Sequence, residues 1–174
     1  MSGLRLNLGS GKKRPEGYVN VDLPGSGADV ECDIRALPFA DGAADEVMAI
    51  HVLEHIPVAD VMGVVAEWAR VLKVGGRMVL ELPCREKVFG LIAQGVTDPR
   101  LVLFPLYGDP RTHRSVADVH RWLWSSVEVA LLMRDAGLVD VTSEPPQFHV
   151  PMRDMRITGV RIGNHESVDA ANGG

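Results

Sequence analysis

The chain has 174 residues, 46% of them hydrophobic and 24% charged, which is enough for one globular domain with a buried core. Its formal net charge of −5 disfavours a protein that binds nucleic acid through bulk positive charge. The two cysteines, Cys32 and Cys84, are too few for a disulfide framework, and no apolar run reaches the ~20 residues of a membrane span.

The N-terminal residues show no basic stretch followed by an apolar one, so we expect no signal peptide. Two isolated thiols are typical of a reducing compartment. The sequence therefore predicts a cytoplasmic protein without a membrane partner.

In the first half of the chain, short apolar stretches bounded by turn residues are typical of strands, and one longer stretch has the periodicity of a helix. Strands are predicted over 4–8, 18–22, 29–32, 44–50 and 78–82. Between the last two, Pro57 is predicted to open a helix whose apolar residues recur every three or four positions to Leu72. Gly75 and Gly76 are predicted to end it.

The second half begins with residues 85–124, which contain three prolines and are predicted to be irregular. This segment holds six basic and four acidic residues. Ser125 and Glu128 form a capping box that opens a helix ending before Gly137. Two final strands are expected over 139–144 and 155–162, and residues 163–174 are expected to form a disordered tail.

This order of elements predicts an α/β protein. We expect a single doubly wound, mostly parallel Rossmann-like sheet of about seven strands, with the last strand antiparallel. One domain would cover residues 1–162, and residues 85–124 within it would form a variable substrate or lid segment.

Glycines and polar side chains follow the predicted strands at the points where each strand ends. Gly9-Ser10-Gly11 follows the first strand, Asp22 ends the second, Asp33 follows the third and His51 ends the fourth. Ligands of open α/β sheets bind at the carboxyl ends of the strands. A carboxylate at the end of the second strand can accept hydrogen bonds from both hydroxyls of a ribose.

The stretches LNLGSG, GYVNVDL, CDIRALPFADGAADEV, HVLEHI and EWARVLKVGGRMVLELP resemble the successive motifs of the class I S-adenosylmethionine (SAM)-dependent methyltransferases. The resemblance is to the methyltransferase type 11-like branch in particular. It is looser over residues 120–162, and residues 85–119 match no motif.

This resemblance implies SAM as the cofactor. The glycine turn and Asn7 would lie along its methionine and ribose, Asp22 would hold the ribose hydroxyls, and Asp33 would accept from the adenine amino group. The implied cofactor-binding residues are Asn7, Gly9, Ser10, Gly11, Asp22, Asp33, Ile34, Leu37 and His51, with Ile34 and Leu37 at the adenine and His51 at the methionine end.

The sequence departs from the family pattern between Gly11 and Asp22, which are only eleven positions apart. A parallel crossover usually takes a dozen or more residues, so the first crossover helix is predicted to be missing or vestigial. One face of the sheet would then be covered by other parts of the chain or by a second subunit, which makes a homodimer one expected assembly. Any lid over the substrate would come from residues 85–124.

Two motifs in this region point to other chemistry. His51-Val-Leu-Glu54-His55 matches the H-x-x-E-H pattern of some zinc proteases. That pattern needs both histidines on one helical face and a third ligand, whereas His51 here ends a predicted strand, so we predict no metal site. The Gly9-Ser10-Gly11 turn has Arg14 where a dinucleotide fingerprint has its third glycine, which disfavours NAD.

The resemblance implies methyl transfer to an oxygen or nitrogen atom of a polar small molecule. A histidine is the natural general base near neutral pH, and the candidates, in order, are His113, His120 and His51. The alternative is a non-catalytic methyltransferase-like partner or regulatory subunit. Nucleic acid is disfavoured as a substrate, because HVLEHI replaces the Asn/Asp-Pro-Pro-aromatic signature of enzymes that methylate amino nitrogens.

Overall fold

The structure is a computed structural model that describes residues 3–113 and 115–163. The predicted tail therefore lies, from residue 164 onward, outside the described residues. Within the described ranges no helix has the length and apolar character needed to cross a membrane.

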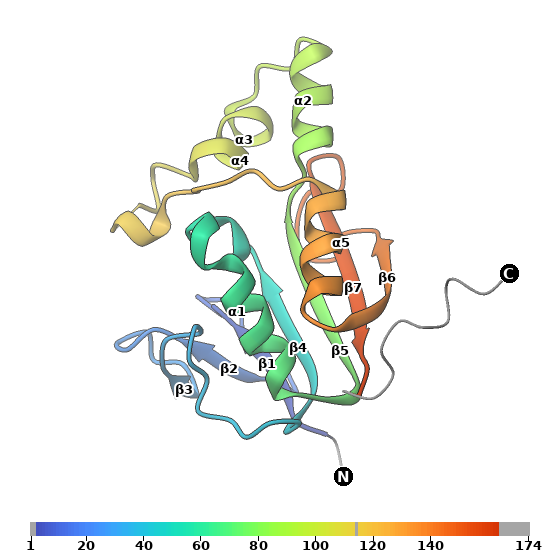
Figure 1. Ribbon diagram of the computed structural model, residues 1–174. Coiled ribbons are helices and arrows are strands. Elements are labelled where there is room, and N and C mark those ends of the chain that lie inside the picture. Colours follow the sequence, from blue (N-terminus) through green and yellow to red (C-terminus); the bar gives the residue numbers. More distant parts are fainter. Residues whose placement is uncertain (1–2, 114, 164–174) are drawn as a thin grey trace, which may run out of the picture.

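Seven strands form one sheet with the spatial order β3-β2-β1-β4-β5-β7-β6 (Figure 1). Neighbouring strands pair in parallel except at β7, which is antiparallel to both β5 and β6. The predicted fold class is confirmed. The strands are β1 Arg5–Leu8, β2 Val19–Asp22, β3 Val30–Glu31, β4 Ala44–Ile50, β5 Leu72–Pro83, β6 Leu138–Glu144 and β7 Asp154–Arg161.

The helix after β4 is shorter than the sequence predicts. The 3-10 turn η1 (Leu53–His55) precedes Pro57, and the helix itself, α1, covers Val58–Val71. Its last turn ends before the glycines because Leu72 pairs with Ala44 as the first residue of β5 and is fully buried. Strand pairing therefore ends this helix, and Gly75 instead makes a turn within β5 with a φ of 79°.

Residues 85–124 are not irregular, which corrects the prediction. They form α2 (Arg85–Ala93), α3 (Pro99–Val102), α4 (Phe104–Tyr107) and the 3-10 turn η2 (Val116–Asp118). Pro99 and Pro105 lie in the first turns of α3 and α4, where proline costs little because the N–H it lacks has no helical partner there. The prolines begin these helices instead of excluding them.

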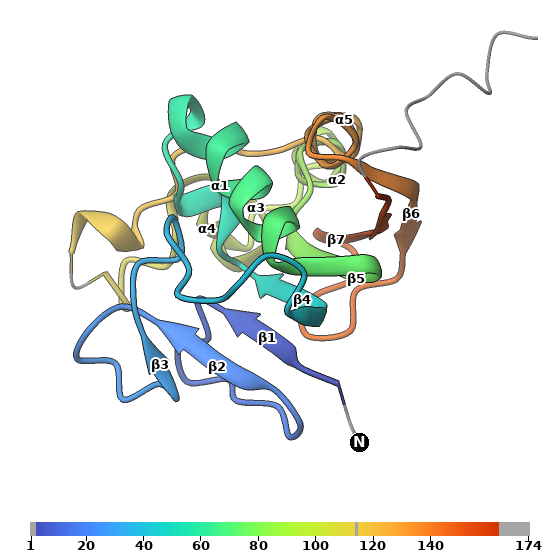
Figure 2. The ribbon, with the colours of Figure 1, turned by 60° about the horizontal axis from the view of Figure 1, so that its bottom comes forward.

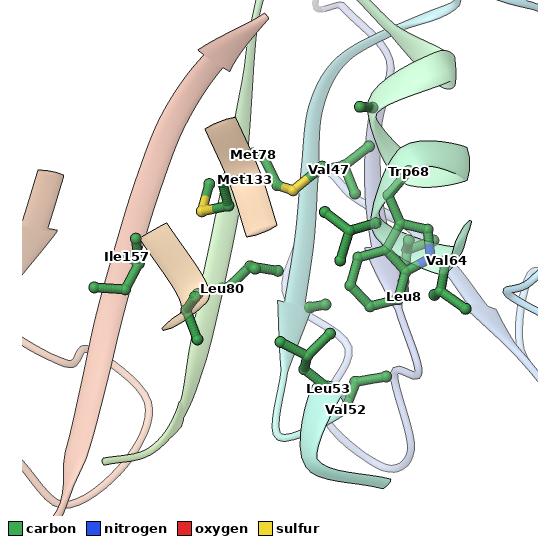
Figure 3. Packing of buried hydrophobic residues seen from close by; sticks show 14 of the residues in the cluster. Leu8, Val47, Val52, Leu53, Val64, Trp68, Met78, Leu80, Met133 and Ile157 are labelled. Atoms are coloured by element: carbon green, nitrogen blue, oxygen red, sulfur yellow. The ribbon is translucent and has the colours of Figure 1, made fainter. Parts of the chain in front are cut away.

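The last helix follows the prediction closely. Helix α5 covers Ser126–Asp135, and both hydrogen bonds of the Ser125–Glu128 capping box are present. Figure 2 shows α1 and α5 on the same side of the sheet. Their buried side chains, among them Trp68 and Met133, meet Leu8, Val47, Leu80 and Ile157 of the strands to form the core (Figure 3).

The opposite face of the sheet carries polar side chains in place of a covering helix. The β1–β2 connection, residues 9–18, contains turns and no helix. Next to it Arg5 pairs with Glu46, and further along the face Arg77 pairs with Glu144. At the carboxyl end of the strands the β6–β7 connection lies over this face, where Gln147 and Phe148 donate backbone hydrogen bonds to Glu81.

The carboxyl ends of the parallel strands all lie at one edge of the sheet, with the segment 85–124 beyond them (Figure 1). The segment is tied to that edge by hydrogen bonds. The backbone N–H of Arg121 donates to the carbonyl of Glu54 at 2.7 Å, and Arg153 of the β6–β7 connection donates to the carbonyl of Arg100 at 2.7 Å.

Candidate active site

A cavity of about 440 Å³ opens at the carboxyl ends of β1, β2 and β4. We call it the cofactor cavity. It combines residues from the strand ends, from η1 and from the segment between α4 and α5. It is lined by Gly9, Gly11, Asp22, Leu23, Asp33, Ile34, Arg35, His51, Val52, His55, Ile56, Pro57, Asp118 and Arg121.

The glycine turn after β1 forms one wall of this cavity. Gly9 and Gly11 have φ values of 60° and 52°, in the left-handed region that glycine adopts without steric cost. A Cβ on Gly9 would lie 2.6 Å from Cγ2 of Val52, so a side chain at this position would displace η1. At Gly11 a Cβ would meet nothing within 4 Å, which leaves the backbone open to a ligand.

The carboxylate of Asp22 is oriented by two backbone N–H groups. Gly11 donates to Oδ2 at 2.7 Å and Leu23 donates to Oδ1 at 2.8 Å. An ionised carboxylate offers about four acceptor positions, so two hydrogen bonds leave acceptor capacity in the cavity. The residue types and their positions fit a ribose with two adjacent hydroxyls.

The loop after β3 is fixed from behind by the core. The buried indole of Trp68 in α1 donates to the carbonyl of Ile34 at 3.0 Å. Beside Ile34, the guanidinium of Arg35 makes a forked ion pair with Asp33 and lowers the pKa of that carboxyl. Arg35 therefore shares the carboxylate that the sequence assigned to the adenine amino group.

A second cavity, of about 390 Å³, adjoins the first. We call it the acceptor cavity. Its walls come from β4, β5, the β6–β7 connection and the segment after α3. It is lined by His51, His55, Pro83, Phe104, Pro105, Asp109, Thr112, Asp118, His120, His149 and Arg153. His51, His55 and Asp118 line both cavities.

His51 lies where the two cavities meet. Its backbone has a φ of 55°, in the left-handed region that residues other than glycine rarely adopt. Its Nδ1 lies 3.0 Å from Oε1 of Glu54, and its Nε2 lies 3.7 Å from Oδ1 of Asp154. Burial opposes protonation of this ring, but the two carboxylates outweigh burial and raise the pKa of His51 above its ordinary value. The ring is therefore a cation at neutral pH.

Two other histidines of the acceptor cavity are neutral. Burial lowers the pKa of His120 and that of His149. The ring of His149 lies against His51, with centroids 3.9 Å apart, and its Nε2 is 2.9 Å from Nζ of Lys13. His120 places Nδ1 2.8 Å from the carbonyl of Pro105.

The structure brings together six of the nine predicted cofactor residues. These six line the cofactor cavity: Gly9, Gly11, Asp22, Asp33, Ile34 and His51. The amide of Asn7 instead donates to Asn20 on the helix-free face, Ser10 lines a small pocket of about 30 Å³, and Leu37 is packed in the core. The roles predicted for these three residues stay predictions.

Of the predicted bases, His51 and His120 line the acceptor cavity and His113 does not. His113 packs against Gly108: a Cβ added to that glycine would be 2.5 Å from Nε2 of His113. His149 and Arg153 also line the acceptor cavity, although neither was predicted from the sequence. Both lie in the connection after β6, whose carboxyl end lies at the same edge as those of the parallel strands. Reading the residues after this strand, as after the first four, would have found them.

Comparison with known proteins agrees with this geometry. Residues 10–80 match the family model of a methyltransferase domain. The resemblance to class I methyltransferases of the type 11 branch is confirmed. No curated protein matches the sequence.

Solved methyltransferases share the fold. A SAM-dependent methyltransferase from Archaeoglobus fulgidus superimposes with a TM-score of 0.64 at 15% identity, over 91% of this chain and 86% of that one. A second, from Thermotoga maritima, gives 0.62 at 18% identity, over 92% and 83%. Human N-acetylserotonin methyltransferase in complex with SAM gives 0.59 at 13% identity, over 92% of this chain and 48% of that one. At these identities the likeness shows the methyltransferase fold alone.

Proposed function

We propose that this protein is a SAM-dependent methyltransferase that methylates an oxygen or nitrogen atom of a small polar molecule. The observation that carries the proposal is the pair of adjoining cavities that meet at His51 and His55. The cofactor cavity has the residues expected around a nucleoside, and the acceptor cavity beside it has polar walls. Methyl transfer needs this adjacency, because the donor carbon and the acceptor atom must be in line.

On the donor side, the backbone at Gly9 and Gly11 would approach the cofactor and the carboxylate of Asp22 would accept from the ribose hydroxyls. Ile34 and Asp33 line the same cavity beyond Asp22, where the adenine attached to that ribose would lie. When bound, SAM supplies an electrophilic methyl group on a sulfonium. The chain supplies orientation and excludes water.

On the acceptor side, Phe104, Pro83 and Pro105 give apolar walls, while His120, Thr112 and Asp109 give polar ones. A hydroxyl or amine acceptor must lose a proton. The ring of His51 already carries both of its protons and cannot accept another. Neutral His120, which also lines the acceptor cavity, would therefore accept the proton. In this proposal His51 positions the reacting groups.

The decisive test is titration calorimetry with SAM and with S-adenosylhomocysteine. We expect both to bind the wild type, and Asp22→Ala to bind at least tenfold more weakly, because hydrogen bonds to a charged group contribute about 1.5–3 kcal/mol each. Glu16→Ala removes an exposed carboxylate from the β1–β2 connection and should bind as the wild type does.

The alternative, a non-catalytic partner or regulatory subunit, predicts a different result. If folded wild-type protein binds neither compound, the enzyme proposal is overturned. Equal binding by the wild type and Asp22→Ala would overturn the assignment of Asp22.

A further inference from the structure

Glu54 is a buried carboxylate that faces several imidazoles. Its side chain is 1% exposed, and neither carboxylate oxygen has a hydrogen-bond partner among the described residues. His51 is close to Oε1 but lacks hydrogen-bond geometry. The protonated ring of His51 offsets part of the cost of burying this charge, but both oxygens keep unfilled acceptor positions, so the side chain can take a further ligand.

One potential metal-ligand atom from each of Glu54, His55 and His120 lies within 4.8 Å of the other two. The Nε2 atom of His120 is 4.0 Å from Oε1 of Glu54. The two imidazole rings meet edge to face, with centroids 4.7 Å apart. In His55, Nδ1 is buried and has no hydrogen-bond partner among the described residues.

The tautomer of His120 follows from its other nitrogen. Nδ1 lies 2.8 Å from the carbonyl oxygen of Pro105, which can only accept, so Nδ1 carries the proton. The lone pair therefore sits on Nε2, which faces Glu54. A histidine that donates from one nitrogen to a carbonyl and offers the other is the usual arrangement of metal-binding histidines.

We propose that Glu54, His55 and His120 bind a divalent transition-metal cation of the Zn²⁺ class. Two imidazoles and one carboxylate are a ligand set that suits zinc and its neighbours in the first transition row, in contrast to Mg²⁺ and Ca²⁺, which prefer oxygen ligands. Metal–ligand distances of about 2.0–2.2 Å put two ligand atoms at most about 4.4 Å apart, so the three atoms, now within 4.8 Å of one another, would draw slightly closer on binding.

Only the tertiary structure reveals this site. The H-x-x-E-H motif puts His51, Glu54 and His55 close together in the sequence, but His51 lies directly after β4 and is not one of the three clustered ligands. The third ligand comes from His120, which follows η2 and reaches Glu54 because Arg121 donates hydrogen bonds to the carbonyls of Glu54 and His55.

The position of the site deepens the proposed function, and this consequence rests on it. His55 lines both cavities and His120 lines the acceptor cavity. Three protein ligands leave a coordination position for water or a substrate oxygen, as in catalytic zinc sites. With the cation bound, Nε2 of His120 would be a ligand and could not take the proton. The acceptor would then be a compound that presents a hydroxyl or carboxylate oxygen to the cation, and a hydroxyl would release its proton to solvent.

The test measures Zn²⁺ binding to tag-free, chelator-treated protein by competition with a chromogenic chelator, and the visible absorption of the protein with Co²⁺. We expect one Zn²⁺ per chain. We also expect His120→Asn and Glu54→Gln to bind at least about a hundredfold more weakly, because even changes outside the ligand shell cost 10–100-fold. His113→Gln changes a histidine that lines neither cavity and should bind Zn²⁺ normally.

Binding of S-adenosylhomocysteine by each variant shows that it is folded and tests the proposed function separately. Failure of Zn²⁺ to bind wild-type protein that does bind S-adenosylhomocysteine would overturn the metal site and leave the methyltransferase proposal standing. Equal Zn²⁺ affinity in the wild type and His120→Asn would also overturn it.

Discussion

Glu81, at the scale of a single residue, shows how the helix-free face of the sheet is stabilised. Its side chain is fully buried and accepts hydrogen bonds from the backbone of Gln147 and Phe148 and from Arg156. Burial by itself would raise the pKa of this carboxyl. The His149 ring 3.7 Å away, the two backbone N–H groups and Arg156 together outweigh burial and lower the pKa of Glu81 to about 2.

This pKa predicts a pH dependence of stability. Since the folded-state pKa is below the unfolded value of 4.5, the ionised side chain stabilises the fold above pH 4.5, and this contribution is lost as the pH falls from about 4.5 to 2. We expect Glu81→Gln to lower the free energy of unfolding at pH 7 by about 3 kcal/mol. The neutral amide loses the stabilisation of the ionised side chain and leaves buried Arg156 paired with the more distant Glu144, at 3.5 Å. Urea denaturation from pH 7 to pH 3 measures both effects.

The difference between the wild type and Glu81→Gln should shrink as the pH falls below 4.5, because the unfolded wild type then binds a proton at this carboxyl that the folded protein does not. The exposed Glu16→Gln serves as the control and should unfold like the wild type at each pH. A difference that stays constant from pH 7 to pH 3 would contradict the lowered pKa.

Among the helices and strands, α5 begins where its local sequence predicts, and its capping residues also make tertiary contacts. The side chain of Ser125 accepts from the backbone of Glu128 at 3.0 Å, and Glu128 accepts from the backbone of Ser125 at 2.8 Å. Glu128 also pairs with Arg85 at the start of α2. The cap thus fixes the start of α5 and joins it to the segment that lies over the site.

Replacement of this cap gives the second prediction. Ser125→Ala should lower the free energy of unfolding by about 1 kcal/mol, because two backbone N–H groups lose or weaken their partners. Chemical denaturation of the purified variant measures the change. Ser126→Ala, one position into the helix, lacks the capping role and should change stability by less than about 0.5 kcal/mol. Equal effects of the two substitutions would argue against the capping box as a source of stability.

The two faces of the sheet differ at the scale of the whole molecule. Helices α1 and α5 bury the apolar face, whereas charged pairs such as Arg5–Glu46 and Arg77–Glu144 occupy the other. Met48 and Val79 on this other face are buried although no helix covers them. Charged pairs and the β6–β7 connection cover the face instead, which explains how a short β1–β2 connection is tolerated. The homodimer stays a prediction, which light scattering on the purified protein would test.

The cavities join the sheet edge to the segment 85–124, and this arrangement gives the third prediction. Asp118 and Arg121 line the cofactor cavity together with Asp22 and Gly11 from the strand ends. A ligand that contacts both sides should reduce opening of the segment. We expect S-adenosylhomocysteine to slow amide hydrogen exchange in 115–124 several-fold, with little change in the capped helix α5. Unchanged exchange in 115–124 with bound ligand would show that the segment takes no part in binding.

The sequence by itself determined where most strands and the last helix lie, and it determined the strand-end side of the cofactor cavity. The apolar strands, the capping box and the residues at the strand ends are local patterns, so Gly9, Asp22 and Asp33 could be predicted to lie at one sheet edge. Burial decided the rest. Leu72 ends α1 by joining the sheet, and His120 and His149 line the acceptor cavity with His51 although they come from distant parts of the chain. Those contacts follow from the packing of distant segments, which no local pattern specifies.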